Sequence, residues 1–120
     1  MDRIRLTVDS SAPPAGEVDE MCSRVPELRR QWESELSAAS AERAAELVMP
    51  AYRLSGRPSR NFQVIGMLLT TIQAHLRENA FPQCVILTCL SEDEATMCRQ
   101  VYNFYIPNTK AERMNSGLWD

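Results

Sequence analysis

A cysteine nucleophile is the first chemistry that the residue types of this chain suggest. Such a nucleophile needs a thiol pKa lowered by its surroundings and a base within reach. Cys89 precedes three carboxylates at residues 92–94, and their negative charge disfavours a thiolate. The single histidine, His75, belongs to a different predicted element. We therefore interpret Cys89 as a small buried hydrophobe, predict no catalytic residue and expect the protein not to be an enzyme.

A zinc site is the second chemistry to consider. Three cysteines and the histidine are of zinc-binding types: His75, Cys84, Cys89 and Cys98. However, Cys84 and Cys89 are an odd number of positions apart, so they would face opposite sides of a regular strand. The chain also has no C-x-x-C pair, no glycine-rich phosphate loop and no G-x-S-x-G motif. We predict neither a metal site nor a cofactor.

The densest polar stretch is the acidic run of Glu92, Asp93 and Glu94, directly after Ser91. A serine followed three positions later by a glutamate is the capping-box pattern, in which each residue satisfies an orphan amide of the other. Carboxylates in a first helical turn also meet the positive end of the helix dipole. We interpret the run as the start of a helix rather than as a catalytic cluster.

The arginines of residues 53–60 form the one candidate ligand site. Residues 50–76 contain no acid, whereas Arg53, Arg57 and Arg60 lie together just before a predicted buried helix. A helix N-terminus with nearby arginines can hold a phosphate. The loop is therefore either a solvated surface loop or a contact site for the phosphates of RNA or DNA.

Candidate interface residues lie in two places. Gly66, Thr70 and Ala74 recur at every fourth position of a predicted helix and form a ridge of small side chains. Such a ridge lets another helix approach closely, either within the chain or across a dimer. Trp119 lies in a C-terminal arm, residues 108–120, and is costly to leave in water. We expect it to dock on this domain or on a partner.

The first predicted strand is residues 4–8. Ile4, Leu6 and Val8 alternate with polar residues, which is typical of a strand with one buried and one wet face. Arg3 and Arg5 would lie on the wet face and could extend a basic patch there.

The second predicted strand is residues 84–90, a continuous apolar run expected of a central strand that is buried on both faces. We expect the two strands to be adjacent, and either a third strand in residues 51–54 or a second copy of the chain to complete the sheet. Helical spacing covers residues 25–49, as one helix or as two, and residues 61–77. A last helix follows Ser91.

Composition and length bound the fold and the environment. The chain has 120 residues, of which 44% are apolar and 24% charged, and a net charge of −3. These values predict one helix-rich α/β (α+β) domain over residues 1–107, with two or three strands packed on three to four helices. The absence of a signal peptide or a long apolar span, and four irregularly spaced cysteines, indicate a soluble intracellular protein, cytoplasmic or nuclear.

Together these features favour a non-enzymatic protein-protein interaction or adaptor module. We expect it to be homodimeric, to have a protein partner that the sequence does not identify, and to have no contact with a membrane. The alternative is nucleic-acid binding through the arginines of residues 53–60.

Overall fold

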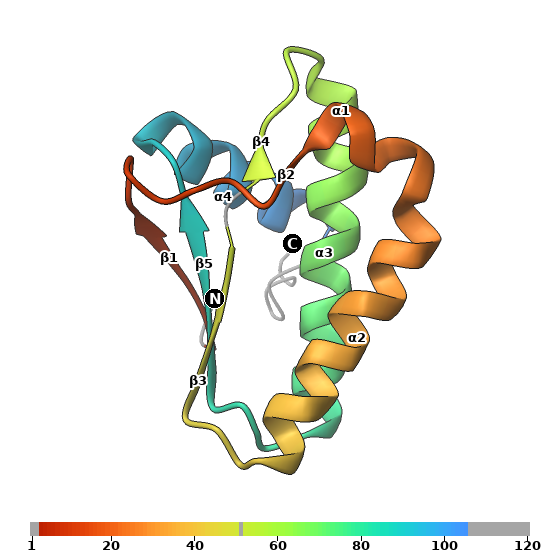
Figure 1. Ribbon diagram of the computed structural model, residues 1–120, viewed down its shortest axis with the longest axis vertical. Coiled ribbons are helices and arrows are strands. Elements are labelled where there is room, and N and C mark those ends of the chain that lie inside the picture. The colour runs from red at the N-terminus through yellow and green to blue at the C-terminus, as the bar shows by residue number, and fades with distance from the viewer. Residues whose placement is uncertain (1–2, 51, 106–120) are drawn as a thin grey trace, which may run out of the picture.

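Strand β5 (Cys84–Cys89) is the central strand of a three-stranded sheet (Figure 1). It pairs in parallel with β1 (Ile4–Val8) along one edge and with β3 (Glu46–Met49) along the other. The computed structural model describes residues 3–50 and 52–105. Within them the predicted helix-rich α+β fold is confirmed, as is the adjacency of the two predicted strands.

The long helices pack on one another beside this sheet. Helices α2 (Val25–Ala41) and α3 (Pro58–Glu78) lie on the same side of it in Figure 1, and α4 (Glu92–Tyr105) follows β5 and packs on α3. Short elements complete the chain: β2 (Gly16–Glu17), α1 (Val18–Met21), the 3₁₀ helix η1 (Cys22–Arg24) and β4 (Tyr52–Arg53). None of the helices in the described ranges has the length and apolar character that a membrane span needs.

The two connections between the parallel strands have opposite hands. The chain crosses the sheet from β1 to β3 and then returns from β3 to β5, in the reverse direction. Right-handed connections would therefore place α2 and α3 on opposite faces of the sheet. Since both helices lie on one side, one connection is left-handed. Within residues 3–50 and 52–105, no helix covers the other face of the sheet.

The core lies between this sheet and the helices. Trp32 is its largest side chain, and the indole Nε1 donates a hydrogen bond to the hydroxyl of Tyr52, with 3.1 Å between N and O. Burial raises the pKa of the Tyr52 hydroxyl, so it remains a neutral partner for the indole. Other core side chains come from the three strands of this sheet and from α2, α3 and α4: Ile4, Leu36, Met49, Val64, Leu69, Ile72, Val85 and Val101.

The prediction of helix throughout residues 25–49 is wrong at its C-terminal end. Helix α2 stops at Ala41, and Arg43 takes a left-handed conformation with φ of 55°. The amide of Ala44 then donates to the carbonyl of Ala39, which closes the helix as a glycine C-cap would. The chain reverses there, and Glu46–Met49 becomes β3 because β5 offers it an open edge.

The third strand was predicted at the wrong place. Tyr52–Arg53 (β4) does not join the sheet of β5, since it pairs with β2 in a separate two-stranded sheet. The prediction that β5 is covered on both faces is also wrong within the described chain. Ile86 and Thr88 remain half-buried, whereas Val85 and Leu87 face the helices and are buried.

Arg3 ties the start of β1 to the end of α3. The guanidinium donates five hydrogen bonds of 2.7–3.0 Å to backbone carbonyls. The acceptors belong to the last turn of α3 and to the loop before β5: Leu76, Asn79, Ala80, Pro82 and Gln83. A cation here also meets the negative end of the helix dipole. Arg3 is thus half-buried and structural, and of the predicted wet pair only Arg5 is exposed.

Arg3→Lys should lower the free energy of unfolding by about 2 kcal/mol, because an ammonium group cannot span carbonyls that a planar guanidinium bridges. Arg5→Lys is the matched control on the same strand, where an exposed arginine should cost less than about 0.5 kcal/mol. Urea unfolding of both variants measures the difference. Equal losses in the two variants would contradict a special role for Arg3.

Candidate functional site

The acidic run after Ser91 is a helix cap, as predicted. The amide of Glu94 donates to Ser91 Oγ at 3.2 Å. The Glu94 carboxylate reaches back to the amide of Leu90, with 2.7 Å between N and Oε1. Glu92 and Asp93 are exposed in the first turn of α4. The run therefore serves the backbone where β5 passes into α4.

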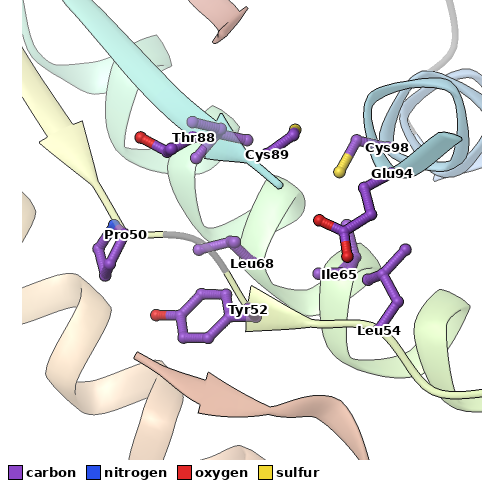
Figure 2. A pocket seen from close by; sticks show the side chains of 10 residues that line it. Pro50, Tyr52, Leu54, Ile65, Leu68, Thr88, Cys89, Glu94 and Cys98 are labelled. Carbon is purple, nitrogen blue, oxygen red and sulfur yellow. The ribbon is translucent and has the colours of Figure 1, made fainter. Parts of the chain in front are cut away.

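A small hollow lies at the C-terminal end of β5, between α3, α4 and β4 (Figure 2). Its cavity volume is about 20 Å³, enough for one water-sized molecule. In parallel sheets, ligands bind outside the C-terminal ends of the strands, so the position is typical of a site even though the volume is small. The lining comes from four elements and their loops: Pro50, Tyr52, Leu54, Ile65, Leu68, Leu87, Thr88, Cys89, Glu94 and Cys98.

Two thiols face this hollow. Cys89 is the last residue of β5 and Cys98 lies in the second turn of α4, and both are buried. A hydrogen bond from Cys98 lowers the pKa of the Cys89 thiol, against the effect of burial. The same hydrogen bond, together with burial, raises the pKa of Cys98. Cys89 is therefore a buried residue, as predicted, but it has a thiol neighbour that the sequence analysis did not pair with it.

The remaining members of the zinc set lie elsewhere. His75 Nε2 is 3.2 Å from the carbonyl oxygen of Phe81, and the histidine does not line the hollow. Cys84 lies at the opposite end of β5 from Cys89. Throughout residues 3–50 and 52–105, no three His, Cys, Asp or Glu side chains are grouped so that they could hold a metal ion.

The arginine loop is organised by polar contacts within the chain. Asn61 is only 2% exposed, and its side chain accepts from the amide of Ser55 and donates to the carbonyl of Ser55. The Ser55 hydroxyl donates to Asp19 Oδ1 at 2.6 Å and accepts from the amide of Arg57. These bonds hold the chain in place as it enters α3, whose first turn has no side-chain cap.

Acidic residues from α1 and β2 lie beside the three arginines. Arg60 forms an ion pair with Asp19 at 2.9 Å, and Arg53 stands directly opposite Glu17 in the pairing of β4 with β2. Hydrogen bonds from Ser55 and then Arg60 lower the pKa of Asp19, so this carboxyl is ionised at neutral pH. Arg57 and Arg60 thus lie near one another around Asp19, and the carboxylates offset part of the positive charge that the sequence grouped at residues 53–60.

Among the described residues, the small-residue ridge of α3 allows a close helix contact at one of its three positions, Gly66. A Cβ atom on Gly66 would lie 2.4 Å from Cε2 of Tyr105, so Gly66 lets the end of α4 approach α3 within the same chain. Thr70 is half-buried and Ala74 is exposed. Trp119 and the arm at residues 108–120 lie outside the described residues.

An aromatic cluster surrounds this contact. The ring centroid of Phe62 is 5.5 Å from that of Phe104 and 6.5 Å from that of Tyr105. Phe104 is 69% exposed, which is unusual for a large apolar side chain. The end of α4 is therefore one apolar surface patch of the described chain.

The uncovered face of the sheet is the second surface. Its side chains alternate along the three strands with those that face the helices: Arg5, Thr7, Glu46, Val48, Cys84, Ile86 and Thr88. Of these, Cys84 is buried. Val48 is 60% exposed on the edge strand β3 and stands beside Ile86 on β5. The apolar middle of this face lies between Arg5 on one edge and Glu46 on the other.

Comparison of the chain with protein-family models, with curated proteins and with solved structures found no match. These surfaces and the hollow are therefore the features from which a function can be inferred. Sequence reasoning missed the uncovered face because it treated residues 46–49 as helix. The only sequence signal for β3 is the pair of branched and apolar residues Leu47 and Val48, which helical spacing also accommodates.

Gly66→Leu should lower the free energy of unfolding by about 1–3 kcal/mol, because the added side chain overlaps Tyr105. The second change Tyr105→Ala should restore part of this loss by making room. Ala74→Leu is the matched control, an exposed position two turns along the same ridge, where the cost should stay below about 0.5 kcal/mol. Urea unfolding of Gly66→Leu, Tyr105→Ala, the double variant and Ala74→Leu gives the coupling free energy between positions 66 and 105. Additive effects of the Gly66 and Tyr105 changes would rule out this contact.

Proposed function

We propose that this protein is a non-enzymatic interaction module that forms homodimers through the uncovered face of the sheet β1–β5–β3. The observation that carries the proposal is a parallel sheet whose helices, in the part of the chain that the structure describes, lie on one side alone. Parallel strands are found almost only in sheets that are covered on both faces. The apolar run of β5 is typical of a strand that is covered on both faces. Ile86, on the face away from the helices, is nevertheless only half-buried.

The opposite charges on the two edges favour a second copy as the cover. A twofold axis parallel to the strands, placed between two stacked sheets, brings β1 of each copy over β3 of its partner. Arg5 on β1 then lies within side-chain reach of Glu46 on the partner's β3, around a centre formed by Val48 and Ile86. If the twofold axis were instead perpendicular to the strands, β1 would face β1 of the partner. The two Arg5 side chains, which carry like charges, would then meet.

The size of this face sets the expected affinity. Strand spacing and rise make it about 10 Å wide and 15 Å long, which is well below the roughly 800 Å² per partner of a standard interface. The dimer should therefore be weak and concentration-dependent unless flanking loops add to it. The arginines of residues 53–60 remain the alternative contact site for nucleic acid, but the neighbouring Asp19 and Glu17 do not favour it.

Val48→Asp should raise the dimer dissociation constant by about tenfold or more, because a charge would be buried in the apolar centre of the interface. Val8→Asp is the matched control: Val8 is an exposed valine, 42% accessible, on the other edge strand, and its register with Cys89 places it on the helix side. Sedimentation equilibrium over a wide concentration range measures both constants. The control should stay within about twofold of the parent.

Charge reversal tests the orientation of the two copies. Arg5→Glu and Glu46→Arg should each weaken the dimer, and the double variant should restore it, because the pair is then exchanged rather than broken. A parent that stays monomeric at all concentrations would refute the proposal. So would a dimer that Val48→Asp leaves unchanged. Added RNA should leave the mass unchanged, whereas salt-dependent RNA binding that is lost on replacing Arg53, Arg57 and Arg60 would establish the alternative.

A further inference from the structure

The hollow at the end of β5 brings two thiols from different elements together. Cys89 is 3% exposed and Cys98 is 7% exposed, and both line the same small cavity. Figure 2 shows their side chains entering the space between the end of β5 and α4 from the two elements, with the Glu94 carboxylate beside them. Neither thiol is used by the dimer surface, which lies on the opposite face of the sheet.

We propose that Cys89 and Cys98 are a peroxide-oxidised dithiol that closes to a reversible disulfide within one chain. In the first step the Cys89 sulfur attacks one oxygen of hydrogen peroxide, the O–O bond breaks, and Cys89 becomes a sulfenic acid while hydroxide leaves and takes up a proton as water. In the second step the Cys98 sulfur attacks the Cys89 sulfur. The S–S bond forms, and the hydroxyl leaves as water with the Cys98 proton.

The overall reaction is balanced without any other reagent. Two thiols lose two electrons and two protons, and one peroxide becomes two waters. An external thiol such as dithiothreitol reverses the step by exchange once unfolding of the chain exposes the disulfide, and it restores both cysteines.

The groups around each thiol determine which of the two cysteines attacks peroxide and which closes the disulfide. Cys98 hydrogen bonds to Cys89 and lowers its pKa, and the positive charge of Arg99 acts in the same direction. Burial and the carboxylates of Glu94 and Glu92 oppose this effect. The pKa of Cys98 is raised by the same hydrogen bond and by burial, so Cys98 is the thiol that attacks second. Cys89 is accordingly the nucleophile.

The cavity selects the oxidant by size. Its rim reaches solvent through half-buried residues, among them Leu54, Thr88 and Glu94. A volume of about 20 Å³ admits little more than one water-sized group, so the sulfur can meet the reacting oxygen of a small oxidant such as peroxide but no larger group. A glutathione disulfide is far too large to reach it. The other two cysteines are not part of the pair, since Cys22 lies on η1 and Cys84 at the far end of β5.

The full-length reduced chain is treated with hydrogen peroxide and analysed by intact mass and peptide mapping. We expect a loss of about 2 Da, one peptide pair joined through Cys89 and Cys98, and recovery of the original mass when dithiothreitol is added to the unfolded chain. Glutathione disulfide at the same concentration should leave the folded protein unchanged. Cys98→Ser should instead stop at a Cys89 sulfenic acid, which dimedone traps when the protein is unfolded in its presence after the peroxide has been removed. Cys89→Ser should show neither product.

Cys22→Ser and Cys84→Ser are the matched controls and should keep the mass loss of the parent. Peptide mapping of the parent decides the question even where a serine variant is unstable. The proposal is overturned if the parent gains oxygen without forming the Cys89 to Cys98 bond, if the bond joins Cys22 or Cys84, or if peroxide leaves all four thiols free. It is also overturned if Cys98→Ser traps no sulfenic acid at Cys89 while remaining folded.

Discussion

Strand β5 is hydrogen bonded along both of its edges, and the rest of the structure depends on this pairing. The strand holds β1 and β3 in parallel register, so residues far apart in the chain, such as Leu6, Leu87 and Met49, stand side by side. Their side chains supply the floor on which α3 packs, and α3 in turn supports α2 and α4. Loss of the central strand would therefore remove the pairing partner of both edge strands and the surface on which α3 packs.

Polar contacts position the ends of the elements that this core leaves open. Arg3 donates hydrogen bonds to carbonyl oxygens at the end of α3 and so joins this end to the start of β1. At the other end of α3, Asn61 and Ser55 shape the incoming loop, and Asp19 links it to α1 through Arg60. Hydrogen bonds that involve a charged group are stronger than those between neutral groups, so the Arg3 guanidinium with its five acceptors links the two elements firmly. Arg3 and Arg60 thus act within the fold.

The same topology creates the two surfaces on which the functional proposals depend. One left-handed connection places α2 and α3 on a single side, so the other face of the sheet keeps Val48 and Ile86 within reach of a partner. At its C-terminal end, β5 turns sharply into α4 through the Ser91 cap, and this turn brings Cys98 back over Cys89. Dimerisation and thiol oxidation would therefore occupy different sides of one strand.

Local patterns in the sequence were sufficient for the elements that local energetics decide. The alternation at residues 4–8, the apolar run of β5 and the capping box at Ser91 all predicted what the structure contains, because a pleat, a buried strand and a helix N-terminus each depend on residues close together in the chain. Only the tertiary structure decided that residues 46–49 are a strand, that Arg3 clasps α3, that Asp19 faces Arg60, and that Cys89 meets Cys98. Each of these depends on a partner distant in sequence, whose pairing energy outweighs local propensity.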